Sequence, residues 1–347
     1  MGATIEEVAK RAQVSKAAVS FALNGREGVS AETRRRILRM ARELNFTPRN
    51  RRSARTERIG FLKLQEHGKI VNRDHDVFIA DYIAGMNVEA HRQCYELFIC
   101  NAAGSFAEYR FPQEEPPAGW IVLGTEFEEK DLESARDLPF PVLFLDTWFE
   151  YQPYTFVTMN NHEAVHAVLS HFREWGHRRV GMVTGNVACA NFRLREDGFA
   201  RVSERLGLDA PPGDRFSVTS TYEAAYAEMS AILGRRKPRG LPTALFCAND
   251  VIAYGTMRAL REQGYRIPAD VSVIGFDDLP ASRTVEPALT TYAVSQERIG
   301  ELGMRNLIES LEDRSAPKPA SKVLVSGKLV ARSSVARPSF NHQTSLD

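Results

Sequence analysis

The N-terminal end of the chain contains the pattern that most restricts the fold: two short helical segments separated by a two-residue break, then a third. Thr4 and Glu7 have the spacing of a capping box, and Ser15 and Ser30 are suited to begin the second and third helices. One face of each segment is apolar, with Ile5, Val8, Ala9, Ala12, Ala18, Val19, Ala22, Leu23, Ile37, Leu38, Ala41 and Leu44. We therefore predict a three-helix domain over residues 1–47 that contains a helix-turn-helix.

Charge is distributed unevenly along the chain. Residues 1–58 contain fourteen Lys and Arg against six Asp and Glu, whereas the remaining residues contain 31 against 38. A basic helix-turn-helix favours double-stranded DNA, because its second helix fits the major groove and its cations release counterions from phosphates. A solvated basic face on a small helical domain is the alternative interpretation of the charge alone.

Beyond residue 58, short apolar runs alternate with helical stretches. Continuous runs such as 119–123, 142–145, 244–247 and 271–276 suit central strands of a parallel sheet that is covered on both faces. Two such sets of strands predict two lobes, with a cleft at the carboxyl ends of the strands. The predicted fold class is α plus α/β: a three-helix helix-turn-helix domain followed by a two-lobed, doubly wound parallel-sheet domain.

Several classes of protein are disfavoured by the sequence. It has no apolar run long enough to span a membrane and no N-terminal signal segment, so we expect a cytoplasmic protein. His162 and His166 have a metal-compatible spacing, but no third ligand is suggested nearby, and we expect neither a metal nor a cofactor. The motifs of dinucleotide-binding, P-loop and α/β-hydrolase enzymes are missing, which argues against an enzyme.

Motifs along almost the whole chain resemble the LacI/GalR family of transcriptional regulators. They are TIEEVAKRAQVSKAAVSFALNGREGVSAETRRRILRMARELNFTP in the head, RLREDGF at 193–199, LPTALFCANDVIAYGTMRAL at 241–260 and IPADVSVIGFDDL at 267–279. The resemblance implies a helix-turn-helix head, a hinge, and a core like that of periplasmic sugar-binding proteins. It also implies a homodimer that binds pseudo-palindromic operator DNA and responds to a small metabolite.

We divide the chain on this basis. The expected parts are a DNA-binding domain at 1–47, a hinge at 48–58, a core at 59–340 and a tail at 341–347. Within the core we expect one lobe at about 59–157 and 293–321, and a second lobe at about 158–292 and 322–338. The tail has no leucine heptads that would join two dimers into a tetramer.

The family motif assigns DNA contacts residue by residue. Lys16 and Ala17 are expected to read base edges, with Lys16 donating to guanine and Ala17 packing on a thymine methyl group. Phe21 stands where many relatives carry Arg or His, so it either meets a thymine methyl group or belongs to the core. Phosphate contacts or helix caps are expected at Thr4, Ser15, Ser20 and Asn24.

The hinge departs from the family pattern. Relatives insert a hinge Leu into the minor groove, whereas Ala54 stands at that position here, in a segment that is one residue shorter. Arg49, Arg51 and Arg52 point instead to phosphates or to a narrow groove. Since an apolar wedge is needed to pry a base step apart, we predict that this chain bends its operator less than its relatives do.

The family motifs and the predicted cleft together give the candidate effector site. Its candidate residues are Phe78, Asp146, Arg195, Tyr222, Asn249 and Asp277. The polar residues suit sugar hydroxyls, and the two aromatic rings suit the C–H faces of a sugar. Alternatively, the three residues that follow strands merely cap helices, the arginine pairs with a surface carboxylate, and Phe78 belongs to the core.

Two segments of the body are unusual for the family. A long polar insert at 65–76 is expected to form a lid or wall of the cleft, and residues 101–118 are shorter than the usual helix and broken by prolines. We expect a repressor of carbohydrate-utilisation genes that a sugar releases from its operator. A regulator that responds to a purine or another corepressor is the alternative, and a sugar-binding protein without a DNA function is a further one.

Overall fold

The computed structural model describes residues 4–23, 28–44, 46, 57–235, 240–312 and 319–338. The chain divides into two compact units, Met1–Thr56 and Glu57–Asp347, which we call the head and the body.

The head contains three helices, α1 (Ile5–Ala12), α2 (Lys16–Leu23) and α3 (Ala31–Glu43). They enclose a small core made of Val8, Ala9, Ala12, Val19, Ala22, Ile37 and Ala41. This core contains only residues that the apolar periodicity had selected, and the predicted three-helix fold is confirmed.

The ends of these helices are set by local hydrogen bonds. The N–H of Glu7 donates to Thr4 Oγ1 at 3.3 Å, and the N–H of Thr4 donates to Glu7 Oε2 at 2.7 Å, which completes the predicted capping box. Gln13 adopts a left-handed conformation with φ of 52° and ends α1. Ser15 Oγ then accepts the N–H of Ala18 at 3.1 Å at the start of α2. The steep break between the two helices is therefore encoded within a few residues.

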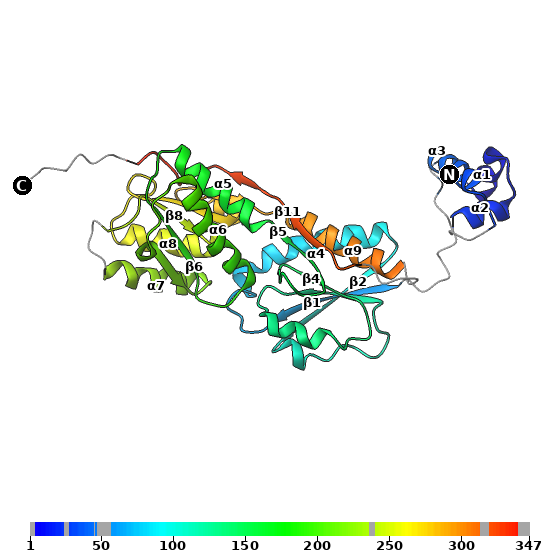
Figure 1. Ribbon diagram of the computed structural model, residues 1–347, viewed down its shortest axis with the longest axis horizontal. Helices are drawn as coiled ribbons and strands as arrows, with labels where there is room; N and C mark the ends of the chain where they lie inside the picture. The colour runs from blue at the N-terminus through cyan, green and yellow to red at the C-terminus, as the bar shows by residue number, and fades with distance from the viewer. Residues whose placement is uncertain are drawn as a thin grey trace, which may run out of the picture. The chain divides into compact units, whose positions relative to one another are not determined.

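The first lobe of the body is built on a six-stranded sheet in the order β11-β5-β4-β3-β1-β2, with all neighbouring strands parallel. The strands are β1 (Arg58–Gln65), β2 (Glu96–Ala103), β3 (Gly119–Leu123), β4 (Val142–Leu145), β5 (Thr155–Met159) and β11 (Lys322–Val325). Helices α4 (Asp76–Arg92) and α9 (Gln296–Glu312) pack against each other beside this sheet (Figure 1). A Cβ atom at Gly300 would lie 2.1 Å from the carbonyl oxygen of Tyr82, so the helices can approach this closely only with glycine there.

Aromatic side chains cover the other face of this sheet. Residues 101–103 complete β2, and the rest of the segment 101–118 contains only the three-residue 3-10 helix η3 (Phe106–Glu108). A second 3-10 helix, η4 (Glu129–Ala135), lies beside it. The rings packed on this face belong to Phe98, Phe106, Tyr109, Phe111, Trp120, Phe127, Phe140, Phe144, Phe149, Tyr154 and Phe156. A cluster of aromatic rings therefore fills the space that a long helix would otherwise cover.

The second lobe contains a six-stranded sheet in the order β12-β10-β9-β8-β6-β7, in which only β12 is antiparallel to its neighbour. Its strands are β6 (Val180–Gly185), β7 (Arg215–Val218), β8 (Ala244–Cys247), β9 (Ser272–Asp277), β10 (Thr290–Ala293) and β12 (Lys328–Val330). Its helices are α5 (Asn161–Glu174), α6 (Ala190–Leu206), α7 (Tyr222–Gly234) and α8 (Asp250–Glu262). They pack as two pairs, α5 with α6 and α7 with α8 (Figure 1). Three further 3-10 helices lie in loops of the body: η2 (Arg73–His75), η5 (Pro212–Asp214) and η6 (Pro280–Arg283).

One expected lobe boundary is wrong. Residues 322–338 were all expected in the second lobe, but β11 pairs with β5 in the first sheet, with Lys322 opposite Phe156. The last crossing from the first sheet to the second lies between β11 and β12. An apolar edge strand carries no local signal that says which of two sheets it will join, so the crossing could not be placed from the sequence.

Candidate functional site: the recognition helix and the interlobe cavity

The exposed face of α2 is the candidate DNA-reading surface of the head. Lys16, Ala17 and Phe21 are exposed, and Ala17 and Phe21 lie one helical turn apart on the same face. Phe21 is 37% exposed and stands outside the core of the head, so of its two expected roles the structure contradicts the core. The ammonium group of Lys16 forms an ion pair with Glu6 of α1.

The other expected DNA contacts fall into two groups. Thr4 and Ser15 are helix caps, and Ser20 is half-buried and has a partner. The remaining five, Asn24, Arg49, Arg51, Arg52 and Ala54, lie outside the described residues.

The body contains a cavity between the carboxyl ends of the strands of its two lobes. The lining residues are Ile70, Val71, His75, Phe78, Ile79, Thr125, Asp146, Met159, Cys189, Asn191, Phe192, Arg195, Asn249 and Asp277. Five of the six expected effector-binding residues are among them. The cavity volume is about 40 Å³, which suffices for a few water molecules, whereas ligand pockets typically measure about 300–1,000 Å³.

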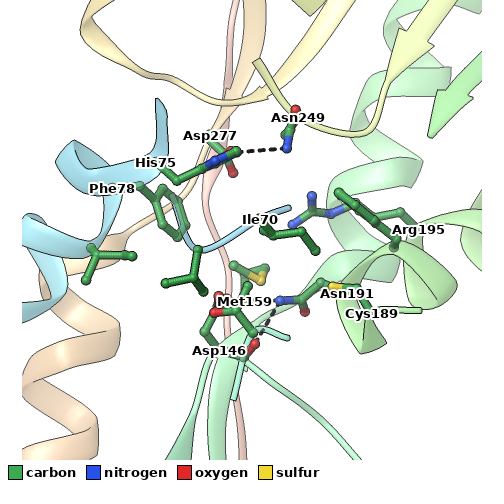
Figure 2. A pocket seen from close by; sticks show the side chains of 14 residues that line it. Ile70, His75, Phe78, Asp146, Met159, Cys189, Asn191, Arg195, Asn249 and Asp277 are labelled. Atoms are coloured by element: carbon green, nitrogen blue, oxygen red, sulfur yellow. Dashed lines mark hydrogen bonds between the residues drawn. The ribbon is translucent and has the colours of Figure 1, made fainter. Parts of the chain in front are cut away.

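Arg195 enters the cavity from α6 and is almost completely buried. Its Nε donates to Asn161 Oδ1 at 2.9 Å, and its guanidinium carbon lies 3.6 Å from the centre of the Phe276 ring. A second bond runs from Nη1 to the carbonyl oxygen of Ala248 at 2.5 Å. Figure 2 shows Arg195 on one side of the cavity and Phe78 on the opposite side. The guanidinium group is therefore held flat and cannot pair with a surface carboxylate.

Two buried carboxylates face the cavity, and both occupy unusual backbone conformations. Asp146 follows β4 with φ of 60°, and Asp277 ends β9 with φ of 120°. Left-handed conformations of residues other than glycine are strained, and such strain collects at functional sites. Burial raises the pKa of the Asp277 carboxyl well above its ordinary value, although the charge of Arg195 opposes this shift.

Asp146 is bonded to groups from both lobes. Its carboxylate accepts from Thr125 Oγ1 at 2.5 Å, from the Tyr82 hydroxyl at 3.0 Å and from Asn191 Nδ2 at 3.0 Å. Burial raises its pKa, and these hydrogen bonds together with Arg195 oppose the rise. Since Asn191 belongs to α6 and Asp146 to the first lobe, this bond joins the lobes (Figure 2).

Asn249 acts both as a helix cap and as a lobe-to-lobe contact. Its Oδ1 accepts the N–H of Ile252 at 2.8 Å, which caps α8, as the alternative interpretation expected. Its Nδ2 donates to Ser220 Oγ at 2.7 Å and to His75 Nε2 at 3.1 Å (Figure 2). Nδ1 of the same imidazole lies 3.2 Å from Asn72 Oδ1. Burial lowers the pKa of His75 to about 4, so its ring is neutral and can accept from Asn249.

The structure places Tyr222 away from the cavity in which it was expected to stack on a ligand. Tyr222 is not one of the residues that line the cavity; its ring lies beside Arg258, whose guanidinium carbon is 6.0 Å from the ring centre. The backbone N–H of Tyr222 donates instead to Asp74 Oδ2 at 3.0 Å. The insert therefore occupies the place beside the start of α7 where a ligand was expected to stack.

Residues 66–76 of this insert, which we call the strap, form one wall of the cavity. Ile70 and Val71 line it and are 5% and 1% exposed. Of the two expected roles of the insert, lid or wall, the structure shows the wall, and it places the apolar side chains of Ile70 and Val71 beside the polar ring of His75 at the cavity. Asn191 was not among the residues predicted from the sequence. It lies one turn before Arg195 on α6, so helical periodicity places the two side chains on the same face and could have identified it.

Two findings concern metals and membranes. Within the described residues, no group of three or more His, Cys, Asp or Glu side chains is arranged to hold a metal ion. Among the helices of that part of the chain, none combines the length and the hydropathy needed to cross a bilayer.

Comparison with known proteins gives similarities over nearly the whole chain. The family model for bacterial regulatory proteins of the lacI family matches residues 4–49, and the model for a periplasmic binding protein-like domain matches residues 169–335. The HTH-type transcriptional repressor PurR of Pasteurella multocida (strain Pm70) is 29% identical over 338 residues, which are 96% of this chain and 98% of the relative. The ribose operon repressor of Haemophilus influenzae (strain ATCC 51907 / DSM 11121 / KW20 / Rd) is 26% identical over 316 residues, covering 90% and 92% of the two chains.

Solved structures share the fold. A complex of the transcriptional regulator CelR with cellobiose has a TM-score of 0.70 at 22% identity, covering 96% of this chain and 99% of the other. A lac repressor dimer bound to operator and the anti-inducer ONPF has a TM-score of 0.65 at 22% identity, covering 97% and 100%.

Proposed function

The chain belongs to the lacI family of bacterial regulatory proteins, and we propose that it represses carbohydrate-utilisation genes under the control of an uncharged sugar bound between its lobes. It is a DNA-binding transcriptional repressor of the LacI/PurR type with an effector-binding core. The relatives are repressors, which confirms the expectation that the chain is not an enzyme. We place its action in the cytoplasm, where operator DNA is found.

The observation that carries the sugar proposal is the division of the cavity into a polar and an apolar side. Arg195, Asp277 and Asn249 offer donors and acceptors that converge from the second lobe. Phe78 and the apolar residues of the strap offer the opposite wall. A sugar also has polar and apolar parts, because its hydroxyl groups lie at the edge of the ring and its C–H groups lie on the ring faces.

The charges in the cavity favour an uncharged ligand. Arg195 is its single arginine or lysine, and two carboxylates, Asp146 and Asp277, share its field. The neutral ring of His75 adds no positive charge. A phosphorylated effector would need cations around its phosphate group, and among the lining residues only Arg195 could supply one, although its guanidinium group already bonds Asn161 and Ala248.

A purine corepressor is the second candidate, because several relatives are PurR repressors. A purine requires a flat slot between apolar faces, to which Phe78 and Phe192 would contribute. The ribose operon repressor and the CelR–cellobiose complex favour a sugar instead. The polarity of the response differs between the two cases, since an inducer weakens operator binding and a corepressor strengthens it.

We propose that Lys16, Ala17 and Phe21 contact base edges in the major groove, with Thr4 and Ser15 close to phosphates. Lys16 would exchange its ion pair with Glu6 for a guanine or a phosphate. The hinge prediction also stays part of the proposal: Ala54 in place of a leucine wedge leaves the operator less bent.

We propose that the protein acts as a homodimer through the first lobe. Val77 and Val88 are 49% and 57% exposed on α4, and Ile99 is 41% exposed on β2, the strand at the edge of the sheet. These elements contact each other, so the exposed side chains supply an apolar surface for a second copy. In a dimer, an effector that moves the lobes changes the spacing of the two hinges and hence the fit of the heads to two half-sites.

Selection of duplexes by the full-length chain from a random DNA library tests the DNA function. A pseudo-palindromic consensus is expected, and a chain without preference for any symmetrical duplex over random DNA would refute it. Operator affinity is then measured with D-ribose, cellobiose, D-glucose, hypoxanthine and guanine, together with thermal unfolding of the same sample. A sugar that raises the midpoint of unfolding and weakens operator binding supports the proposal, whereas a purine that strengthens operator binding would replace it with the corepressor alternative.

A further inference from the structure

One fully buried carboxylate outside the expected site holds a segment of backbone in place. Glu126 follows β3, and its two oxygens accept five backbone N–H groups of the insert. The donors are Glu66, His67 and Gly68 to Oε2 at 2.8, 3.0 and 3.2 Å, and Ile70 and Val71 to Oε1 at 2.8 Å each. Hydrogen bonds to a charged acceptor are the stronger kind, and five of them converge on this one side chain.

The same strap contacts the second lobe at its other end. Asp74 Oδ2 accepts the N–H of Tyr222 at 3.0 Å, and His75 Nε2 accepts from Asn249 Nδ2 at 3.1 Å. The strap is thus fixed to the first lobe through Glu126 and touches the second lobe through these two bonds. Its middle residues form the apolar wall of the cavity.

A ligand of sugar size does not fit a cavity of about 40 Å³, so binding requires movement. Room can be gained in two ways: the strap withdraws while the lobes stay in place, or the lobes shift relative to each other. Only the second way moves the parts of the body to which the paired heads are joined. Withdrawal of the strap would leave the fully buried carboxylate of Glu126 without its five donors, which is costly.

We propose that Glu126 is a positioning residue that couples effector binding to movement of the lobes. Because Glu126 holds the strap in place, the strap does not withdraw when the effector binds. The cavity then gains room only if the two lobes shift relative to each other. The inference rests on the proposed function, since it assumes that a cavity ligand changes operator affinity. It concerns a residue that contacts neither the ligand nor DNA.

The test uses the full-length variant Glu126→Gln. Its amide nitrogen replaces one acceptor oxygen with a donor and opposes the N–H groups that face it. We expect backbone hydrogen exchange at residues 66–71 to accelerate at least tenfold. The effector should bind as tightly as to wild type or more tightly, whereas its effect on operator affinity should fall towards onefold from a wild-type value in the usual range of about 5–150-fold. Glu150→Gln, which changes an exposed carboxylate of the same lobe, is the matched control and should behave as wild type.

The effector probes are D-ribose, cellobiose, hypoxanthine and guanine. If none of them changes the operator affinity of the wild-type protein, the proposed effector function fails. If one does, and Glu126→Gln responds as strongly as wild type, only the coupling inference fails. The shorter variant Glu126→Asp, with an expected intermediate loss of response, serves if the glutamine variant does not fold.

A measurement on the wild-type protein tests the same inference without a variant. The five amides held by Glu126 should exchange slowly both without and with a bound effector, because the strap stays in place while the lobes move. If effector binding exposes these amides to exchange, the strap is the moving part, and the proposed role of Glu126 is overturned.

Discussion

Replacing a thymine of the operator by deoxyuridine removes one methyl group and leaves every hydrogen-bonding group of the base pair unchanged. It therefore tests whether Phe21 reads DNA through apolar contact. The structure places this ring on the exposed face of α2, one turn after Ala17 and outside the core of the head. A ring with no polar atom can distinguish a thymine in the major groove only by its methyl group.

The expected magnitude follows from the size of the group removed. Burying one methyl group contributes about 0.8 kcal/mol, which corresponds to about a fourfold change in affinity. A dimer reads two half-sites, so substitution at both symmetry-related positions should cost about 1.6 kcal/mol, or about 15-fold. In the Phe21→Ala variant the same substitution should cost almost nothing, because the side chain that buries the methyl group is gone.

The assay is fluorescence anisotropy on the selected operator, with each thymine replaced in turn and salt concentration held constant. Thymines outside the reach of α2 are the internal control and should tolerate the change. The reasoning is refuted if no position loses more than about 1.5-fold in affinity, or if Phe21→Ala loses as much as wild type at the sensitive position.

Three further predictions concern the body. Arg195→Lys should weaken effector binding about 30–150-fold in titration calorimetry, because lysine cannot keep the planar hydrogen bonds of the guanidinium group. An unchanged affinity would show that Arg195 does not take part in effector binding. Burial lowers the pKa of His177 to about 4, so its contribution to stability is complete above pH 6.5 and is lost as the pH falls towards 4. Urea unfolding should show the free-energy difference between wild type and His177→Gln shrinking by about 3 kcal/mol over this range, and a constant difference would contradict the assignment. Gly300→Ala should destabilise the body by about 3 kcal/mol or more in the same assay, because its Cβ meets the Tyr82 carbonyl oxygen, and a neutral effect would contradict the described helix packing.

The head could be predicted almost completely because its determinants are local. Thr4 and Glu7 are three residues apart, and Ser15 caps a helix that begins at the next residue. Short-range spacing of this kind is visible in a sequence, and the same applies to the apolar periodicity that selects the core. The sequence does not decide whether Phe21 belongs to the core or to the surface, because periodicity on an eight-residue helix does not separate a residue at the edge of the apolar face from one beyond it.

The cavity could be predicted in part because parallel strands bring their carboxyl ends together. Asp146, Asn249 and Asp277 each stand at such an end, and a doubly wound fold gathers these positions whatever the loops do. Tyr222 stands instead at the start of a helix, and its environment depends on what packs there. The strap takes that place, and the sequence does not show how a long insert folds back onto its own lobe.

Glu126 illustrates why this part of the site was inaccessible to sequence reasoning. Its five hydrogen-bond donors are backbone groups that lie 55–60 positions earlier in the chain, and backbone N–H groups are identical in nearly every residue. No choice of side chain in the strap signals the contact. The only hint is an acidic residue shortly after a buried strand, which is also where helix-capping acids occur. Motif analysis therefore does not detect side chains that hold a backbone segment of the same lobe. This is true even where, as proposed for Glu126, such a side chain determines whether effector binding changes operator affinity.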